Sequence, residues 1–315
     1  MSSNCHLGSL LINLTYRQGR PLIEFRTLET FVWVAQLKSF RGAAARLNTT
    51  QPAVSQRVAQ LEDQLGVRLL ERGRRSFALT EAGRSVLAQA ERLLRLRTEL
   101  VASVTDRSQL RGTLRLGAAE TIVHTWLPRF IEAMSARYER ITLEIEVDIS
   151  PNLRERLLSQ QIDLAFMLGP ISAPSIRSQP LRNEPIRFFA SPRLGFSAGQ
   201  NPLAEIAAFP IITFARNTQP YMRLRELLAD PHLPPTRIHA SAAMATAVRM
   251  ALDGLGVALI PASIVTEDVE AGRLVEVGCA QTIPDLQFVA GWLAAPDTRI
   301  IDLALEIAAA SAAGR

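Results

Sequence analysis

The sequence is poor in residues that build covalent or metal-dependent sites. Its 315 residues include only two cysteines, Cys5 and Cys279, and four histidines. Two distant cysteines cannot form a disulfide framework, which fits a reducing cytoplasm, and the histidines lack the spacing of metal ligands. We therefore expect no cofactor and no metal, and we interpret the histidines as surface or packing residues.

Motifs of common enzyme and membrane classes are also missing. The chain has no Gly-x-Ser-x-Gly elbow and no Gly-Lys-Thr phosphate loop. The glycines of 253–257 lie between a predicted helix and a predicted strand, which is the wrong order for a dinucleotide fingerprint. No apolar run reaches membrane-spanning length, and Ser9–Leu14 is too short for a signal-peptide core. The sequence thus predicts a cytoplasmic protein that is not an enzyme and has no membrane partner.

Positive charge is concentrated in the N-terminal third. Residues 1–110 carry 16 basic and 9 acidic side chains, whereas residues 111–315 carry 19 and 21. The basic residues are arginines except for Lys38, and the arginine fork suits phosphate oxygens, although a codon bias would give the same count. This distribution indicates that the N-terminal third binds nucleic acid.

Three short helices are predicted in the positively charged segment. Apolar residues recur with helical spacing over 25–37, and Ser39 and Thr50 are placed to cap the next two helices. Pro52 is compatible with the first turn of the third helix, where a backbone N–H has no helical partner. The third helix has an apolar stripe that consists of Val54, Val58, Leu61 and Leu65.

Two helices joined by a polar turn are typical of a helix-turn-helix, whose second helix enters the major groove of DNA. The alternative is a three-helix bundle with an ordinary polar surface, which the clustered positive charge disfavours. A basic, glycine-containing turn follows and predicts a hairpin wing that contacts phosphates, with a solvated charged loop as the alternative. The expected DNA contacts are Ser39, Thr49, Thr50, Gln51, Pro52, Ser55, Gln56, Arg57, Arg72, Arg74 and Arg75.

A long helix is predicted after the wing. Thr80 is its expected cap, and apolar residues from Val86 to Val104 recur at close to the 3.5-residue spacing of a coiled coil. We interpret this seam as a dimerisation surface, because a dimer reads two half-sites of DNA. The alternative is that the helix packs on its own domain.

A series of short motifs runs in order along this part of the chain. They are Leu28-Glu29-Thr30-Phe31, Ser39-Phe40, Ala43-Ala44-Ala45-Arg46-Leu47, Thr50-Gln51-Pro52-Ala53-Val54-Ser55, Leu61-Glu62, Leu65-Gly66, Leu69-Leu70-Glu71-Arg72 and Leu79-Thr80-Glu81-Ala82-Gly83. With these motifs, residues 24–110 resemble the N-terminal domain of LysR-type transcriptional regulators. The resemblance implies base contacts from the start of the third helix. Gln56 departs from the basic residue common there, and Arg57 follows it, so either side chain could reach the groove.

The resemblance also implies a C-terminal effector domain similar to periplasmic solute-binding proteins. Alternating strands and helices after residue 110 independently predict two α/β lobes with mostly parallel sheets, and the length suits several domains. Thr142–Ile149 alternates apolar and polar residues, which favours an edge strand or an oligomer contact.

Residues 1–23 are either flexible or reflect a start placed too far upstream. The predicted divisions are 24–80 for the winged helix-turn-helix, 80–110 for the linker helix and hinge, 111–190 with 265–315 for the first lobe, and 191–264 for the second lobe.

The expected secondary structure of this domain is as follows. The predicted strands are Thr113–Ala118, Thr142–Asp148, Ile162–Leu168, Ile211–Ala215, Arg237–Ser241 and Val257–Ile260. The predicted helices are Trp126–Tyr138, Leu153–Gln160, Met222–Ala229 and Ala245–Leu252. We expect the chain to cross between the lobes at Ala190–Pro202 and again near Pro261–Glu267.

Ligands of open α/β sheets bind at the carboxyl ends of the strands, between lobes. At this place Glu120 and Arg216 could bind the two charges of a zwitterion, although either side chain could instead face solvent. The alternative effector class is a small organic acid. The expected lining residues are Ala119, Glu120, Thr121, Met167, Gly169, Phe214, Arg216, Thr218, Ser241 and Met244.

The sequence as a whole predicts an effector-dependent transcriptional regulator. Its expected partners are an interrupted palindrome of double-stranded DNA, a small molecule, RNA polymerase and further copies of the chain in a homodimer or homotetramer. The rival interpretation is an enzyme or solute-binding protein with an incidental helix-turn-helix.

Overall fold

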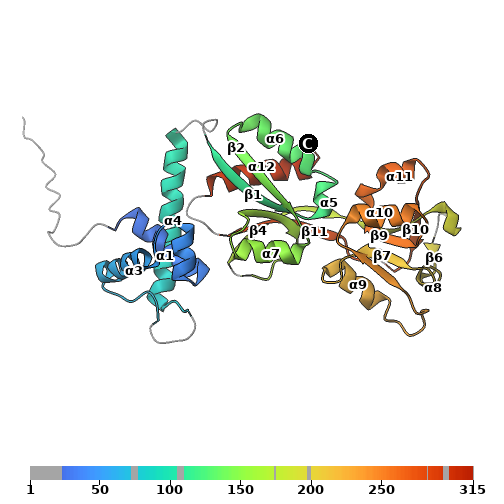
Figure 1. The fold of residues 1–315 in the computed structure, drawn as a ribbon, viewed down its shortest axis with the longest axis horizontal. Helices are drawn as coiled ribbons and strands as arrows, with labels where there is room; N and C mark the ends of the chain where they lie inside the picture. Colours follow the sequence, from blue (N-terminus) through green and yellow to red (C-terminus); the bar gives the residue numbers. More distant parts are fainter. Residues whose placement is uncertain are drawn as a thin grey trace, which may run out of the picture. The chain divides into compact units, whose positions relative to one another are not determined.

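The computed structural model describes residues 23–71, 77–104, 110–173, 175–196, 200–281, 283–293 and 298–314. The chain divides near residue 94 into two compact units, an N-terminal head and a C-terminal domain (Figure 1). None of the helices in these ranges is long and apolar enough to cross a membrane.

The head is built on three helices, which the sequence predicts correctly. They are α1 (Phe25–Leu37), α2 (Phe40–Arg46) and α3 (Gln51–Leu65). The Ser39 hydroxyl accepts a hydrogen bond from the Gly42 N–H at 3.0 Å, and the Thr50 hydroxyl accepts one from the Ala53 N–H at 3.4 Å. Both residues are therefore N-caps, as expected. The core between the helices is formed by Phe31, Val32, Val34, Ala43, Val54, Val58 and Leu61.

The stem of the wing connects α3 to α4 (Glu81–Val104). Leu70 and Leu79 form an antiparallel bridge, and the Glu71 N–H donates to the Ala78 carbonyl at 3.0 Å. Residues 72–76 lie outside the described ranges. The Thr80 hydroxyl accepts from the Gly83 N–H at 2.9 Å, which confirms Thr80 as the cap of the long helix.

The apolar seam of α4 divides between two faces. Ala90 and Leu94 are buried, and Gln36 on α1 donates to the neighbouring Glu91 carboxylate at 3.1 Å, so this face packs on the head. Leu93, Leu96 and Leu100 recur at heptad spacing and are 46%, 49% and 68% exposed. The alternative of packing on the same domain is thus correct for one face, while a second apolar face remains exposed.

The first lobe of the C-terminal domain is a five-stranded sheet in the order β2-β1-β3-β11-β4. Strand β2 lies at an edge, as its alternating sequence predicts. Helices α6 and α12 pack against each other, and α7 packs on β3 and β11 (Figure 1). The Phe166 ring of β3 lies 5.0 Å from the Trp126 ring and 5.2 Å from the Phe130 ring at the core of this lobe.

The strands of the first lobe are β1 (Gly112–Ala118), β2 (Ile141–Val147), β3 (Leu164–Leu168), β4 (Ile176–Glu184) and β11 (Leu286–Leu293). Its helices are α5 (Glu120–Val123), α6 (Leu127–Arg137), α7 (Ser150–Leu158) and α12 (Arg299–Ala312).

The second lobe is a six-stranded sheet in the order β6-β10-β5-β9-β7-β8. Helix α10 packs on β9 and β7, and α9 packs on β7. The strands are β5 (Ile186–Ala190), β6 (Gln200–Asn201), β7 (Ile211–Phe214), β8 (Ile238–Ser241), β9 (Val257–Pro261) and β10 (Val275–Cys279). The helices are α8 (Leu203–Ala207), α9 (Gln219–Leu227), α10 (Met244–Leu252) and α11 (Thr266–Glu270), with short 3₁₀ turns at Pro192–Leu194 and Ala262–Ile264.

The expected crossings between the lobes are wrong. Strand β4 ends at Glu184 in the first sheet, and after Pro185 strand β5 pairs with β9 of the second sheet. The return lies between β10 and β11, after residue 279, because β10 also pairs with β5. The second lobe thus spans about residues 186–279, not 191–264.

The sheets are mixed rather than mostly parallel. Strands β1, β2 and β3 pair in parallel, as do β7, β8 and β9, but β11 and β5 are antiparallel to their neighbours in these groups. Strands β5 and β11 are the first strands after the chain crosses from one lobe to the other. Because the sequence analysis does not predict these two strands, it also misplaces both crossings.

Candidate functional site

The start of α3 is a polar, solvent-facing surface. Val54 and Val58 are buried beneath it, while Gln51, Ser55 and Gln56 are exposed. Arg57 and Thr49 are half-buried, and Thr50 and Pro52 are exposed. The apolar stripe fixes which side of the helix faces outward, so exposed amides and a hydroxyl are available for base edges, the chemistry that major-groove reading uses.

The structure describes some of the basic side chains of the head. Arg41 on α2 is exposed. Arg46 lies over the Trp33 ring at 4.9 Å from its centroid, so it also contributes to packing. The expected wing residues Arg72, Arg74 and Arg75 lie outside the described residues, and their phosphate contacts stay a prediction.

A buried carboxylate fixes the wing stem against α3. Glu62 accepts hydrogen bonds from the Leu69 N–H at 2.7 Å, the Leu70 N–H at 3.2 Å and the Arg68 guanidinium at 2.9 Å. Burial would raise the pKa of Glu62, but the two backbone N–H groups and Arg68 outweigh it, and the pKa is lowered from its ordinary value of 4.5. The stem is thereby tied to α3.

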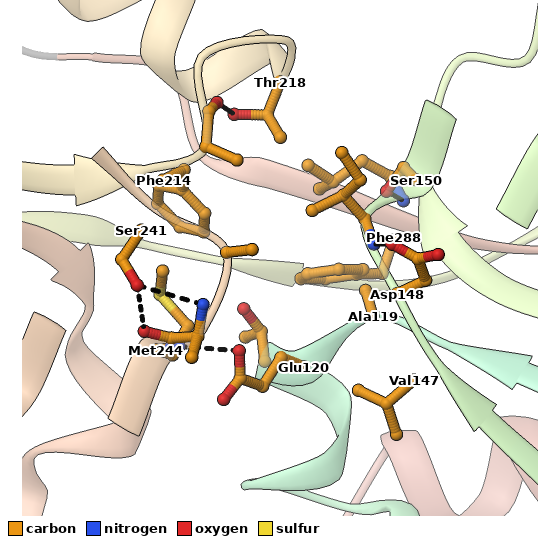
Figure 2. Close-up of a pocket in the computed structure, with 16 residues that line it drawn as sticks. Ala119, Glu120, Val147, Asp148, Ser150, Phe214, Thr218, Ser241, Met244 and Phe288 are labelled. Carbon is orange, nitrogen blue, oxygen red and sulfur yellow. Dashed lines mark hydrogen bonds between the residues drawn. The ribbon is translucent and has the colours of Figure 1, made fainter. Parts of the chain in front are cut away.

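A pocket of about 330 Å³ lies between the two lobes of the C-terminal domain (Figure 2). It is formed by the segments that follow β1 and β2 of the first sheet and β7 and β8 of the second, together with residues of β3 and β11. It therefore occupies the carboxyl ends of the parallel strands, the place where open α/β sheets bind ligands.

Most of the expected ligand residues line this pocket. These are Ala119, Glu120, Thr121, Phe214, Thr218, Ser241 and Met244. Three expected residues do not. Met167 and Gly169 line a neighbouring cavity of about 430 Å³, and Arg216 is exposed and absent from the lining of either cavity. The clamp of Glu120 and Arg216 is thus not formed, because the turn after β7 directs position 216 to the surface.

Glu120 instead makes a contact between the lobes. One carboxylate oxygen accepts from the Met244 N–H at 2.6 Å, and the other lies 3.5 Å from the Ala245 nitrogen and 3.4 Å from His124 Nε2. Figure 2 shows Glu120 extending from the first lobe toward the start of α10. The first N–H groups of a helix are an anion-binding position, and here a side chain of the protein occupies it.

The other polar groups of the pocket are mostly engaged in local structure. Asp148 accepts from the Ile149 N–H and the Asn152 amide, both at 2.8 Å. The Ser150 hydroxyl accepts from the Leu168 N–H at 2.9 Å, and the Thr218 hydroxyl donates to the Ala215 carbonyl at 2.6 Å. Among the described residues that line the pocket, none is lysine, arginine or histidine.

Several lining residues were not anticipated. They include Val147, the last residue of β2, and Asp148, Ile149 and Ser150, which follow it; the rule that ligands bind at the carboxyl ends of strands applies to this edge strand as well. Phe288 lies on β11, a strand that the sequence did not reveal. Within the described ranges, no group of three His, Cys, Asp or Glu side chains could hold a metal ion.

Comparison with known sequences assigns both parts of the chain. Residues 25–84 match the family described as the bacterial regulatory helix-turn-helix protein, lysR family, and residues 107–310 match the LysR substrate binding domain. The regulator BbuR of Bordetella bronchiseptica is 29% identical over 260 residues, which cover 82% of this chain and 79% of that protein. The regulator YofA of Bacillus velezensis is 28% identical, and the match covers 77% of this chain and 82% of that protein.

Solved structures of full-length regulators share the fold. LysG of Corynebacterium glutamicum with bound effector arginine superimposes with a TM-score of 0.60 at 20% identity, covering 92% of this chain and 98% of that one. An OxyR variant of Pseudomonas aeruginosa superimposes with a TM-score of 0.57 at 23% identity, covering 93% of this chain and 95% of that one.

Proposed function

The chain belongs to the LysR family of bacterial transcriptional regulators, and on that basis we propose that α3 reads the bases of a promoter site while the pocket between the lobes binds the effector. Members of this family are regulators and not enzymes, which excludes the rival interpretation of an enzyme with an incidental helix-turn-helix. The exposed polar start of α3 over its buried stripe carries the base-reading proposal.

Gln51 and Arg74 are expected to contribute differently to DNA binding. Gln51→Ala should reduce the discrimination between the specific site and random DNA by about tenfold, because a base-edge contact is lost. Arg74→Ala should weaken binding to all sequences similarly and reduce the salt dependence by about one phosphate contact. Mobility-shift titrations at several salt concentrations measure both effects. An equal loss on specific and random DNA for Gln51→Ala would refute its role.

The exposed apolar face of α4 supports a dimer. Leu93, Leu96 and Leu100 follow heptad spacing, and such a seam on a helix is stabilised when it packs against a partner helix. A dimer presents two recognition helices to an interrupted palindrome, and pairs of dimers would form a tetramer.

Charge on this face should separate the subunits. We expect Leu93→Glu with Leu96→Glu to move dimer dissociation to at least about tenfold higher protein concentration, because the apolar seam is lost. Sedimentation velocity measures the change. Ala88→Glu places one glutamate at an exposed position outside the heptad seam and should leave the assembly unchanged. Equal dissociation of both variants would contradict the coiled coil.

The effector acts through a difference in its affinity for two arrangements of the domain. LysG, which shares the fold, is described with bound arginine, and the pocket here has the size and position for a small metabolite. Closure of the lobes around a ligand would be transmitted through α4, change the bending of DNA and so alter the recruitment of RNA polymerase. Since the DNA of a bacterium lies in the cytoplasm, the regulator is proposed to work there.

A further inference from the structure

The charges around the pocket differ from those expected for an anionic ligand. Two of the described lining residues, Glu120 and Asp148, are carboxylates, and none is basic. Their side chains are 19% and 26% exposed, so both are partly withdrawn from solvent, and Asp148 also pairs at 3.8 Å with Arg156, which lies outside the lining. A ligand carboxylate near them would meet like charge where water screens poorly.

The two carboxylates also use the backbone donors that an anion would need. Glu120 accepts from the Met244 N–H, the first of α10, and Asp148 accepts from the N–H of Ile149, the residue before α7. The start of α10 would otherwise attract an anion. Glu120 keeps one oxygen with only long contacts, at 3.4 and 3.5 Å, which leaves it able to accept from a ligand.

The walls of the pocket suit an apolar body that carries a positive charge. Phe214, Phe288 and Met244 lie around the same space as Glu120 in Figure 2. Aromatic faces attract organic cations through the ring quadrupole, and the attraction increases as water is excluded. Aromatic walls with a carboxylate therefore recognise an ammonium or guanidinium group better than a carboxylate.

Thr121 supplies a second polar contact for a ligand. It is 3% exposed and lines the pocket, and its hydroxyl has no hydrogen-bond partner among the residues that the structure describes. The residue is buried, but its hydroxyl oxygen is not among the fully buried atoms without a partner, so it stays accessible from the pocket. A hydroxyl beside Glu120 can accept from the same N–H donor group.

We propose that the effector is a small organic cation, with a protonated amine or guanidinium bound by Glu120 and Thr121 and its apolar part between Phe214 and Phe288. This inference rests on the proposed function, because it takes the pocket as the effector site. Glu120 is then the residue that determines specificity: it fills the anion position at α10 and rejects simple carboxylates.

Matched ligands of opposite charge test the assignment on the purified full-length chain. Three pairs share an apolar body: phenethylammonium and hydrocinnamate, cyclohexylmethylammonium and cyclohexylacetate, and butylammonium and pentanoate. Calorimetric titration should show that at least one ammonium compound binds about tenfold more tightly than its carboxylate partner, the effect of one charge-assisted contact. In Glu120→Gln, which keeps an oxygen to accept from Met244, the preference should fall by about tenfold.

The control is Glu205→Gln, which removes an exposed carboxylate of α8 outside the pocket and should retain the wild-type preference. A carboxylate preference in the wild type, equal binding within every pair, or binding of none of the six compounds would overturn the proposal; none of these results depends on a variant that folds. Ligand binding is measured without DNA, so a failure to shift promoter DNA would overturn the proposed function and leave the charge preference standing.

Discussion

Gly83→Ala should strongly destabilise the head and so weaken specific DNA binding. Gly83 lies in the first turn of α4, and an added methyl group would collide with the backbone carbonyl of Leu69 in the wing stem. A backbone atom cannot rotate away as a side chain does, so α4 and the stem must separate. We expect a loss of about 3 kcal/mol of stability in the head. Hydrogen exchange of the α1 and α3 amides should become about a hundredfold faster.

Gly42→Ala is the matched control. Gly42 is also a helical glycine, but its added methyl group would meet side-chain atoms of Leu37 and Ser39 at ordinary contact distances of 3.4 Å and more. Alanine favours the helix by about 1 kcal/mol over glycine. Exchange in this variant should be unchanged or slower. If exchange became equally faster in the two variants, the close approach of α4 to the Leu69 carbonyl would not be what determines the stability of the head.

Glu62→Ala should destabilise the head by a similar amount. It leaves the N–H groups of Leu69 and Leu70 without their acceptor, and Leu69 is fully buried. Removing the acceptor of buried donors costs about 3 kcal/mol when the acceptor is charged. Glu62→Gln keeps an acceptor oxygen and should cost about 1 kcal/mol. Exchange of the α3 amides again measures both changes.

The contribution of Glu62 should depend on pH in a defined direction. Its pKa in the folded head is lowered from 4.5, so the carboxylate stabilises the head above the ordinary pKa. That stabilisation is lost as the pH falls below 4.5 and through the lower pKa of the folded state. The difference in protection between wild type and Glu62→Gln should therefore shrink on acidification. A difference that grows instead would contradict the shift.

The head could be predicted from its sequence because its signals are local. Helical spacing places Phe31 and Val54 in the core, and the caps Ser39 and Thr50 act on N–H groups only three residues away. The role of Glu62 could not be predicted in the same way. Its partners Leu69 and Leu70 come within reach only after the chain turns at the end of α3.

The lobes were harder to delimit because their connections are long-range. Pro185 separates two strands of different sheets with no loop between them. The proline- and glycine-rich sequence of 190–202 is typical of a linker, whereas its described residues 190–196 and 200–202 belong to the second lobe. Strand β4 contains Pro180 and many polar residues, which an edge strand tolerates and which hide it from pattern analysis. The contact of Glu120 with Met244 joins residues 124 positions apart, so only the fold reveals it.

The wing stem has a mechanical consequence. Leu69 donates its N–H to Glu62 on α3, and its carbonyl accepts from the Thr80 N–H at 3.0 Å, at the start of α4. One residue thus couples α3 to α4, and the two helices are expected to move together. A signal that arrives along α4 would swing the whole head and leave its internal angles intact. In the proposed dimer, regulation would then alter the separation of the two α3 helices along the duplex, with the same side chains presented to each half-site.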